Sequence, residues 1–167
     1  MSARPGLVCA IAWEGFQRIG HGGASALAPA NTLASFDATV AVGIDMVEFD
    51  VREWRGELVL AHTIFRAARG GNVPLGDALA HLAGERFGGV DLNVDVNPGF
   101  AARLLDDLRG AGLLERTLLS SQVTAVIDRL RMLDPHARTR ISSVGKSTKR
   151  QAHCGRRRGT AHRVRWG

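Results

Sequence analysis

Cysteine and long apolar runs are scarce in this sequence, and each absence excludes a class of protein. Only two cysteines occur, Cys9 and Cys154, and they lie far apart without the spacing of metal ligands. A disulfide framework is therefore not expected, and a reducing cytoplasm suits the chain better. No run approaches the ~18 apolar residues that a membrane-spanning helix requires, and the N-terminal apolar stretch is too short for a signal peptide. We expect a cytoplasmic protein with no transmembrane segment.

Lysine is absent from the first 145 residues, and acidic residues are absent after Asp134. Ten of the 22 lysines and arginines lie between Arg138 and Gly167, which leaves 12 basic against 16 acidic residues in the rest of the chain. The net charge of +6 therefore combines an acidic body with a basic C-terminal segment. The abrupt change favours a tail outside the fold, such as the product of a shifted reading frame or a truncated gene. A basic arm for nucleic acid or an anionic membrane is the alternative, but we expect no nucleic-acid partner.

The length of 167 residues and the apolar content of 45% are typical of one globular domain with a core of its own. We divide the chain into an N-terminal extension over residues 1–15, a folded domain over 16–142, and a basic, disordered tail over 143–167. Short apolar runs alternate with amphipathic stretches within the folded domain. Strands are expected at 16–21, 45–53, 57–62, 90–97, 116–121 and 137–142. Helices are expected at 31–43, 74–84, 100–112 and 123–134.

This order of elements, with its short connections, predicts an α/β fold with a parallel sheet and crossover helices. An open doubly wound sheet and part of a (β/α)8 barrel both agree with it. No glycine-rich dinucleotide-binding motif follows the first strand, so the Rossmann version of the open sheet is disfavoured.

Polar side chains occur at or near the ends of these strands, where ligands bind in parallel α/β folds. They are His21, Glu48, Asp50, His62, Asn93, Asp95 and Asn97. Glu48 and Asp50 lie two residues apart, so both leave the same face of their strand, together with Met46 and Arg52. Two adjacent carboxylates repel each other unless a cation lies between them or one is protonated. Hard cations such as Mg²⁺ or Ca²⁺ prefer oxygen ligands, and Asp95 could supply a third.

A solvated strand face is the alternative explanation for the Glu48 and Asp50 pair, and it is the commoner one for such a pair alone. The ordered set of a histidine, two carboxylates, a second histidine and a third carboxylate on successive strands favours a chemical site instead. His81 lies within an expected helix and is interpreted as a surface residue.

Several short motifs, in this order, resemble those of the glycerophosphodiester phosphodiesterases over about residues 18–140. They are His21-Gly22-Gly23, Pro29-Ala30-Asn31-Thr32, Glu48-Phe49-Asp50, His62-Thr63, Leu92-Asn93-Val94-Asp95-Val96-Asn97 and Ser120-Ser121. The resemblance implies an incomplete parallel (β/α)8 TIM barrel, with about six of the eight strands. It also implies hydrolysis of glycerophosphodiesters to glycerol 3-phosphate and an alcohol, in phospholipid metabolism.

The resemblance also assigns roles to particular residues. His21 and His62 would be the general acid and the general base, in an order that the sequence leaves open. One divalent metal ion, Mg²⁺ or Ca²⁺, would be held by Glu48, Asp50 and Asp95. The small-molecule glycerophosphodiester substrate would be contacted by Gly22, Asn31 and Asn97.

Some positions depart from the family's pattern. Gly22 stands where the family has an arginine that contacts phosphate, and Asn97 stands where a lysine is frequent. Thr63 replaces the aspartate that follows the second histidine, and Asp95 is shorter than the usual glutamate. Because fewer than eight strands are expected, the barrel would have an open edge. The alternative function is therefore a non-catalytic, truncated remnant that self-associates or pairs with a partner through that edge.

Overall fold

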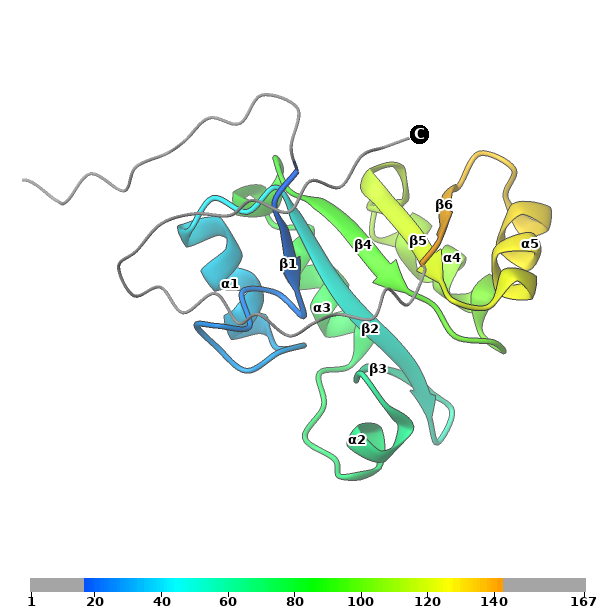
Figure 1. Cartoon of the computed structure of the whole chain (residues 1–167), viewed down its shortest axis with the longest axis horizontal. Coiled ribbons are helices and arrows are strands. Elements are labelled where there is room, and N and C mark those ends of the chain that lie inside the picture. The colour runs from blue at the N-terminus through cyan, green and yellow to red at the C-terminus, as the bar shows by residue number, and fades with distance from the viewer. Residues whose placement is uncertain (1–16, 143–167) are drawn as a thin grey trace, which may run out of the picture.

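The computed structural model describes residues 17–142, and the predicted N-terminal extension and basic tail lie outside these described residues. Strands and helices follow one another in the expected order (Figure 1). The strands are β1 Ile19–His21, β2 Met46–Trp54, β3 Glu57–Leu60, β4 Asp91–Asp95, β5 Thr117–Ser121 and β6 Arg138–Ile141. The helices are α1 Leu33–Ala41, α2 Ile64–Ala68, α3 Leu75–Leu82, α4 Ala101–Gly110 and α5 Thr124–Leu133, with two 3-10 turns at Glu85–Phe87 and Leu114–Arg116.

The strands form one six-stranded sheet in the order β1-β2-β4-β5-β6, with β3 attached to β2. The pairs along this path are all parallel, so the expected parallel α/β sheet is confirmed. Among the described residues the sheet does not close, and β1 and β6 are its edges. This arrangement is compatible with an incomplete TIM barrel.

The strand β3 corrects one expectation, because it runs antiparallel to β2 instead of continuing the parallel sheet. The connection between the two strands is only Arg55 and Gly56, which have φ angles of 52° and 80°. A two-residue turn with positive φ at both positions joins antiparallel strands, whereas a parallel crossover needs about a dozen residues or more. His62 therefore follows a hairpin strand that returns along β2.

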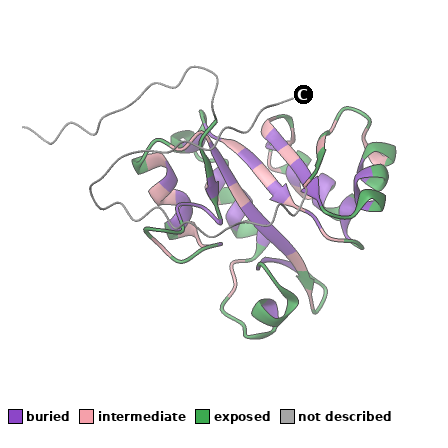
Figure 2. Ribbon diagram, viewed as in Figure 1, coloured by how far each residue is buried: buried purple, intermediate pink, exposed green. Residues whose placement is uncertain are grey.

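One face of the sheet packs against α1, α3, α4 and α5 and forms the core (Figure 2). Val47, Phe49 and Val51 on β2 are fully buried in it, and the ring centroid of Phe36 in α1 lies 5.5 Å from that of Phe49. Side chains alternate along a strand, so the residues between them leave the opposite face. We call this opposite face the inner face; on β2 it carries Met46, Glu48, Asp50 and Arg52.

Helix α1 begins in a turn that joins it to the loop after β1. Thr32 caps the helix, since its hydroxyl accepts a hydrogen bond from the Ser35 amide, and the Ser35 hydroxyl faces the Thr32 amide in return. The Ser35 hydroxyl also lies 2.9 Å from the Gly22 carbonyl, to which it donates. These contacts fix the β1–α1 loop against the start of the helix.

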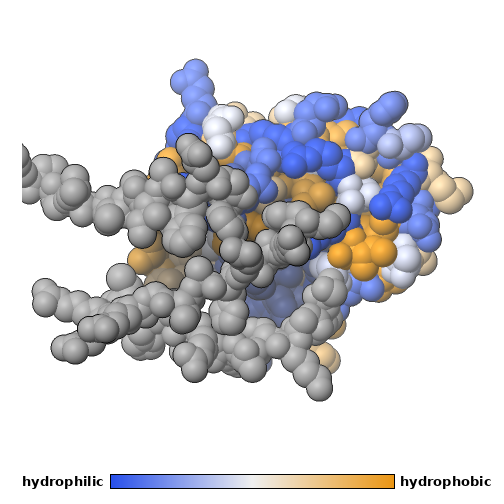
Figure 3. All heavy atoms as spheres, turned by 45° about the horizontal axis from the view of Figure 1, so that its top comes forward, coloured by the Kyte–Doolittle hydropathy of each residue, from blue (hydrophilic) through white to orange (hydrophobic). Residues whose placement is uncertain are grey.

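Helix α2 was not expected, because its five residues are too few to show a helical period. Its one sequence signal is Thr63, whose hydroxyl accepts a hydrogen bond from the Arg66 amide at 3.1 Å. On the face shown in Figure 3, apolar side chains lie among hydrophilic ones. Among the described residues, Phe65 in α2 and Met132 in α5 are the most exposed large apolar side chains, at 78% and 75%. Figure 1 shows these two helices well apart, so the two side chains do not share a patch.

Gly23 and Gly56 provide a matched test of how tightly the β1–α1 loop is packed. Both have a φ of +80°, but a Cβ atom on Gly23 would lie 2.4 Å from the Ser35 hydroxyl, whereas one on Gly56 would meet nothing within 4 Å. We expect Gly56→Ala to lower the free energy of unfolding by about 1–2 kcal/mol, the cost of the left-handed backbone. Gly23→Ala should cost about 1–3 kcal/mol more, because Ser35 must move. Urea denaturation measures both, and equal losses would show that the loop accommodates the added methyl group.

Candidate active site

The register of the parallel strands places the predicted carboxylates side by side on the inner face. The Cα atom of Glu48 pairs with those of His21 on one side and Asn93 on the other. Two residues further along β2, the Cα atom of Asp50 pairs with that of Asp95. Four of the predicted site residues therefore lie on adjacent strands at the carboxyl end of the sheet, where ligands bind in this class of fold.

Glu48 lies between the first predicted histidine and the glycines of the β1–α1 loop. Its Oε2 atom is 3.5 Å from Nδ1 of His21 and accepts a hydrogen bond from the Gly22 amide at 2.9 Å. Positive φ angles of 62° and 80° at Gly22 and Gly23 turn the chain sharply, which brings that amide to the carboxylate. The His21 side chain is 77% exposed and can therefore reach a ligand from solvent.

Asp50 is buried, with 4% of its surface exposed. It forms hydrogen bonds with both the nitrogen and the oxygen of the Asn31 side-chain amide. Nδ2 of Asn31 donates to Oδ2 of Asp50 at 3.0 Å, and the Asp50 backbone amide donates to Oδ1 of Asn31 at 3.1 Å. Asn31 adopts a left-handed φ of 60°, which asparagine tolerates better than most residues. Asn31 therefore positions Asp50 in this structure, and a contact of Asn31 with substrate stays a prediction.

Arg52 links Asp95, His62 and Asn97 at the outer end of the inner face. Its Nη2 atom donates to the His62 carbonyl at 2.7 Å and lies 3.7 Å from Oδ2 of Asp95, while Nη1 donates to the Val51 carbonyl at 2.8 Å. The Asn97 amide oxygen, oriented toward Arg52, accepts from both terminal nitrogens, with Nη2 at 3.2 Å. The His62 side chain is exposed, and its backbone lies near Asp95 because Arg52 contacts both.

Burial and mutual repulsion shift the pKa values of two of the carboxyl groups. Burial raises the pKa of Glu48 above its usual range, and the charge of Asp50 raises it further, although the Gly22 amide opposes the shift. Burial and the charge of Asp50 also raise the pKa of Asp95, against the opposing charge of Arg52. Both groups therefore lack sufficient positive charge around them.

The donor chemistry of these residues fits a hard divalent cation. Glu48, Asp50 and Asp95 offer only oxygen atoms, as Mg²⁺ and Ca²⁺ prefer. Asn93, the register partner of Glu48, has a buried Oδ1 atom without a hydrogen-bond partner among the described residues. Within residues 17–142, however, no three histidine, cysteine or acidic side chains lie close enough together to hold a metal ion. Closure of the three carboxylates around one ion stays a prediction.

Two features of the site were not predicted from the sequence. The alternation of side chains along the strand placed Arg52 on the face of Glu48 and Asp50. Its contacts with Asp95 and His62, however, depend on the tertiary fold. The use of the Gly22 amide as a donor to Glu48 was also missed, because a backbone group leaves no mark in the sequence. Ser120 and Ser121, which belong to the quoted motifs, are buried.

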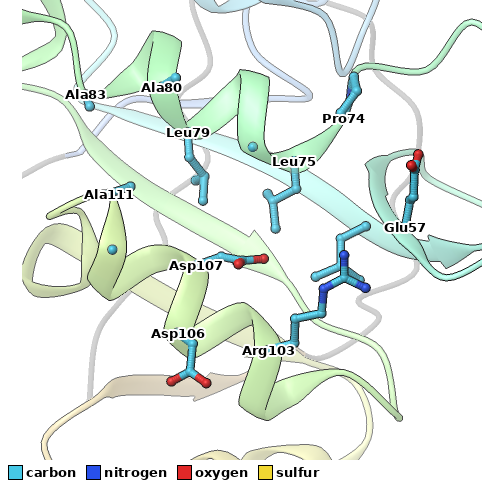
Figure 4. A pocket seen from close by; sticks show the side chains of 13 residues that line it. Glu57, Pro74, Leu75, Leu79, Ala80, Ala83, Arg103, Asp106, Asp107 and Ala111 are labelled. Carbon is cyan, nitrogen blue, oxygen red and sulfur yellow. The ribbon is translucent and has the colours of Figure 1, made fainter.

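A large cavity lies elsewhere, between α3 and α4 on the helical side of the sheet (Figure 4). Its volume is about 660 Å³, and its lining includes Glu57, Leu79, Arg103 and Asp107. None of the predicted site residues lines it. His81, interpreted from the sequence as a surface residue, is partly buried and pairs with Asp37 across 2.6 Å.

Solved structures show the same fold. A glycerophosphodiester phosphodiesterase from Agrobacterium tumefaciens is 23% identical, with a TM-score of 0.63 over 74% of this chain and 66% of that chain. A phosphodiesterase from Oleispira antarctica, in complex with the product sn-glycerol-3-phosphate, is 21% identical, with a TM-score of 0.64 over 79% and 68%. A glycerophosphodiester phosphodiesterase from Parabacteroides distasonis is 17% identical, with a TM-score of 0.62 over 75% and 64%. The chain thus spans roughly two thirds of the length of these structures, and the predicted fold class is confirmed.

A sequence model of the glycerophosphoryl diester phosphodiesterase family matches residues 21–63. This segment contains His21, Glu48, Asp50 and His62, whereas Asp95 lies outside it. The predicted resemblance to this family, and to its class of enzyme, is confirmed. No curated protein matches the chain significantly. None of the helices within residues 17–142 combines the length and apolar character needed to cross a membrane.

The raised pKa of Glu48 predicts how stability depends on pH. Because the folded pKa lies above the unfolded value, the folded state binds a proton first as the pH falls, and stability rises through that window. Glu48→Gln mimics the protonated form and keeps an acceptor for Gly22. We therefore expect Glu48→Gln to be more stable than the wild type at neutral pH, with a difference that vanishes below the ordinary glutamate pKa.

Urea unfolding between about pH 4 and pH 7 measures this difference. Glu53→Gln is the control, because Glu53 lies on the same strand but is exposed. A Glu48→Gln variant that is less stable than the wild type at neutral pH would contradict the prediction.

Proposed function

We propose that this chain is a metal-dependent glycerophosphodiester phosphodiesterase that releases glycerol 3-phosphate and an alcohol. The observation that carries the proposal is that two exposed histidines border a group of carboxylates at the carboxyl end of one sheet. His21 lies beside Glu48, and Arg52 bonds the His62 carbonyl and pairs with Asp95. The match of the family model to residues 21–63 supports the same activity.

The three carboxylates would hold the metal ion, Mg²⁺ or Ca²⁺. The residues for this role are Glu48, Asp50 and Asp95, and the unpaired Oδ1 of Asn93 is a further oxygen next to Glu48. A bound cation supplies positive charge to the phosphate oxygens, which gain negative charge when phosphorus is attacked. Its charge would also relieve the repulsion that raises the pKa values of Glu48 and Asp95.

His21 and His62 would perform the proton transfers. The attacking hydroxyl group must lose a proton, and the departing alkoxide must gain one, so two imidazole side chains, which can both accept and donate a proton, suit the reaction. Glu48 is close enough to Nδ1 of His21 to orient its ring. His62 is held through its backbone, by the bond from Arg52 to its carbonyl.

Gly22, Asn31 and Asn97 would line the substrate-binding region as predicted. Gly22 presents its backbone amide to Glu48, and Asn31 and Asn97 act by positioning Asp50 and Arg52. The Oleispira antarctica structure with bound sn-glycerol-3-phosphate supports glycerol 3-phosphate as the product. Such a product would place the reaction in phospholipid metabolism, and we propose the cytoplasm as its location.

Loss of His21 should abolish turnover. With a glycerophosphodiester such as glycerophosphocholine and millimolar Mg²⁺ or Ca²⁺, we expect the wild type to release glycerol 3-phosphate, and a chelator to stop the reaction. His21→Ala and His62→Ala should each lower kcat by about 10²–10⁴-fold, the usual contribution of a general acid or base.

His136→Ala is the matched control, since His136 is exposed and lies in the segment before β6. A coupled assay for glycerol 3-phosphate gives the rates. Folded wild-type protein without turnover in either metal would refute the proposed activity.

The second candidate is a non-catalytic remnant that self-associates. It is favoured by the two edges of the described sheet, because β1 and β6 each pair on one side only. Unpaired backbone groups on an edge strand can pair with another chain. Ile19 on β1 is 45% exposed, which makes that edge partly apolar.

This candidate predicts a dimer that depends on the β1 edge. We expect light scattering after size-exclusion chromatography to show a mass above the monomer, reduced toward the monomer by Ile19→Lys, since a charge on an edge strand opposes pairing. Met132→Lys, a substitution at a more exposed apolar position in α5, should leave the mass unchanged. A wild-type monomer at all concentrations would exclude this candidate.

A further inference from the structure

Arg52 is a cation whose charge is held mainly by neutral oxygens. Its terminal nitrogens donate to the carbonyls of Val51 and His62 and to the amide oxygen of Asn97. Its carboxylate neighbour, Asp95, lies 3.7 Å away, beyond the length of a hydrogen bond. The guanidinium is therefore held in place by neutral oxygens and by one long ion pair with Asp95.

Two exposed arginines have closer counter-ions than Arg52, whereas the part-buried Arg116 also donates to backbone carbonyls. Arg18 approaches Asp45 at 3.0 Å, and Arg109 approaches Asp134 at 2.8 Å, with side chains that are 60% and 43% exposed. The Arg52 side chain is only 15% exposed. Asp95 is the ion-pair partner of Arg52 among the described residues, and its distance of 3.7 Å leaves the guanidinium able to bind a second, closer anion.

The position of Arg52 suits a ligand of the candidate active site. It is the inner-face residue that follows Asp50 toward the carboxyl end of β2, and it contacts the backbone of His62. Its Nε–H has no hydrogen-bond acceptor among the described residues, so one donor remains for a ligand. Guanidinium groups bind phosphate oxygens strongly because their donors match the spacing of those oxygens.

We propose that Arg52 supplies the positive charge that binds the phosphate group of the ligand, an organic phosphate of the glycerol 3-phosphate type. The chemical class of the ligand rests on the proposed function, whereas the anion-binding role rests on the contacts of Arg52 itself. Nearby arginines do not share the arrangement. Arg55 lies in the hairpin turn with its guanidinium over the ring of Trp54, and Arg66 bonds the Gly70 carbonyl within the segment after β3.

Calorimetric titration of the full chain with sn-glycerol 3-phosphate, with and without Mg²⁺, tests the proposal. We expect Arg52→Gln to weaken binding about ten- to a hundredfold, as the loss of a charged hydrogen bond does. Arg55→Gln is the matched control and should bind within about twofold of the wild type, because Arg55 is exposed and lies outside the site.

A purely structural role for Arg52 gives a different result. The wild-type affinity should fall as salt rises, and Arg52→Gln should show a weaker dependence on salt, because one phosphate contact is gone. If Arg52 only ties His62 to the sheet, Arg52→Gln would lower the melting temperature while the affinity and its salt dependence stayed as in the wild type. That result would overturn the proposal.

Two further variants keep the test decisive if Arg52→Gln does not fold. Arg52→Lys keeps the charge and should bind more tightly than any neutral substitution. Asn97→Asp would place a carboxylate where Arg52 now meets a neutral amide, so it should weaken phosphate binding. An affinity that Asn97→Asp leaves unchanged would count against the proposal.

The outcomes also separate this proposal from the proposed function. Arg52-dependent binding of glycerol 3-phosphate without hydrolysis would refute the enzymatic activity and leave the role of Arg52 standing. Hydrolysis with unchanged rates and affinities in Arg52→Gln would refute the role of Arg52 alone. A wild type that binds neither glycerol 3-phosphate nor inorganic phosphate would refute the anion-binding role.

Discussion

The repulsion between carboxylates on the inner face is the constraint on which the rest of the site depends. The parallel register of β2 and β4 brings Asp50 and Asp95 together, with Glu48 two residues earlier on β2. Each carboxylate has one polar neighbour from another part of the chain. The Gly22 amide donates to Glu48, the Asn31 amide donates to Asp50, and Arg52 lies near Asp95. These contacts only partly offset burial and repulsion, which together keep the pKa values of Glu48 and Asp95 raised.

The glycine-rich loop after β1 contributes to the site through its backbone as much as through His21. Gly22 presents its amide to Glu48, and Gly23 allows the Ser35 side chain to lie against the loop. Asn31 closes the same loop onto Asp50. A side chain at either glycine would be strained, because both have positive φ angles. The glycines and the turn before α1 are therefore needed together, since they determine the positions of two carboxylates.

Much of the fold followed from local patterns, because the buried residues of β2 and β4 alternate with polar ones and the longer helices show an apolar period. The antiparallel direction of β3 was not predicted, although Arg55 and Gly56 determine it, since a two-residue connection cannot cross over to a parallel strand. The shared face of Glu48 and Asp50 was predictable, because side chains alternate between the two faces of a strand. The role of Asn31 could not be predicted, because its partner Asp50 lies 19 residues away and the two hydrogen bonds between them form only in the folded chain.

The residues around His62 show how a site can keep its geometry when its side chains change. Thr63 occupies the position where the family resembled has an aspartate, and here its hydroxyl starts α2 instead of orienting the imidazole. The backbone of His62 is nevertheless held, because Arg52 donates to its carbonyl and the Ala61 amide donates to the Asp50 carbonyl. Backbone contacts of this kind do not depend on the identity of residue 63. A guanidinium that extends from β2 to this segment and to Asn97 can therefore add a positive charge at a rim where Gly22 and Asn97 themselves carry none.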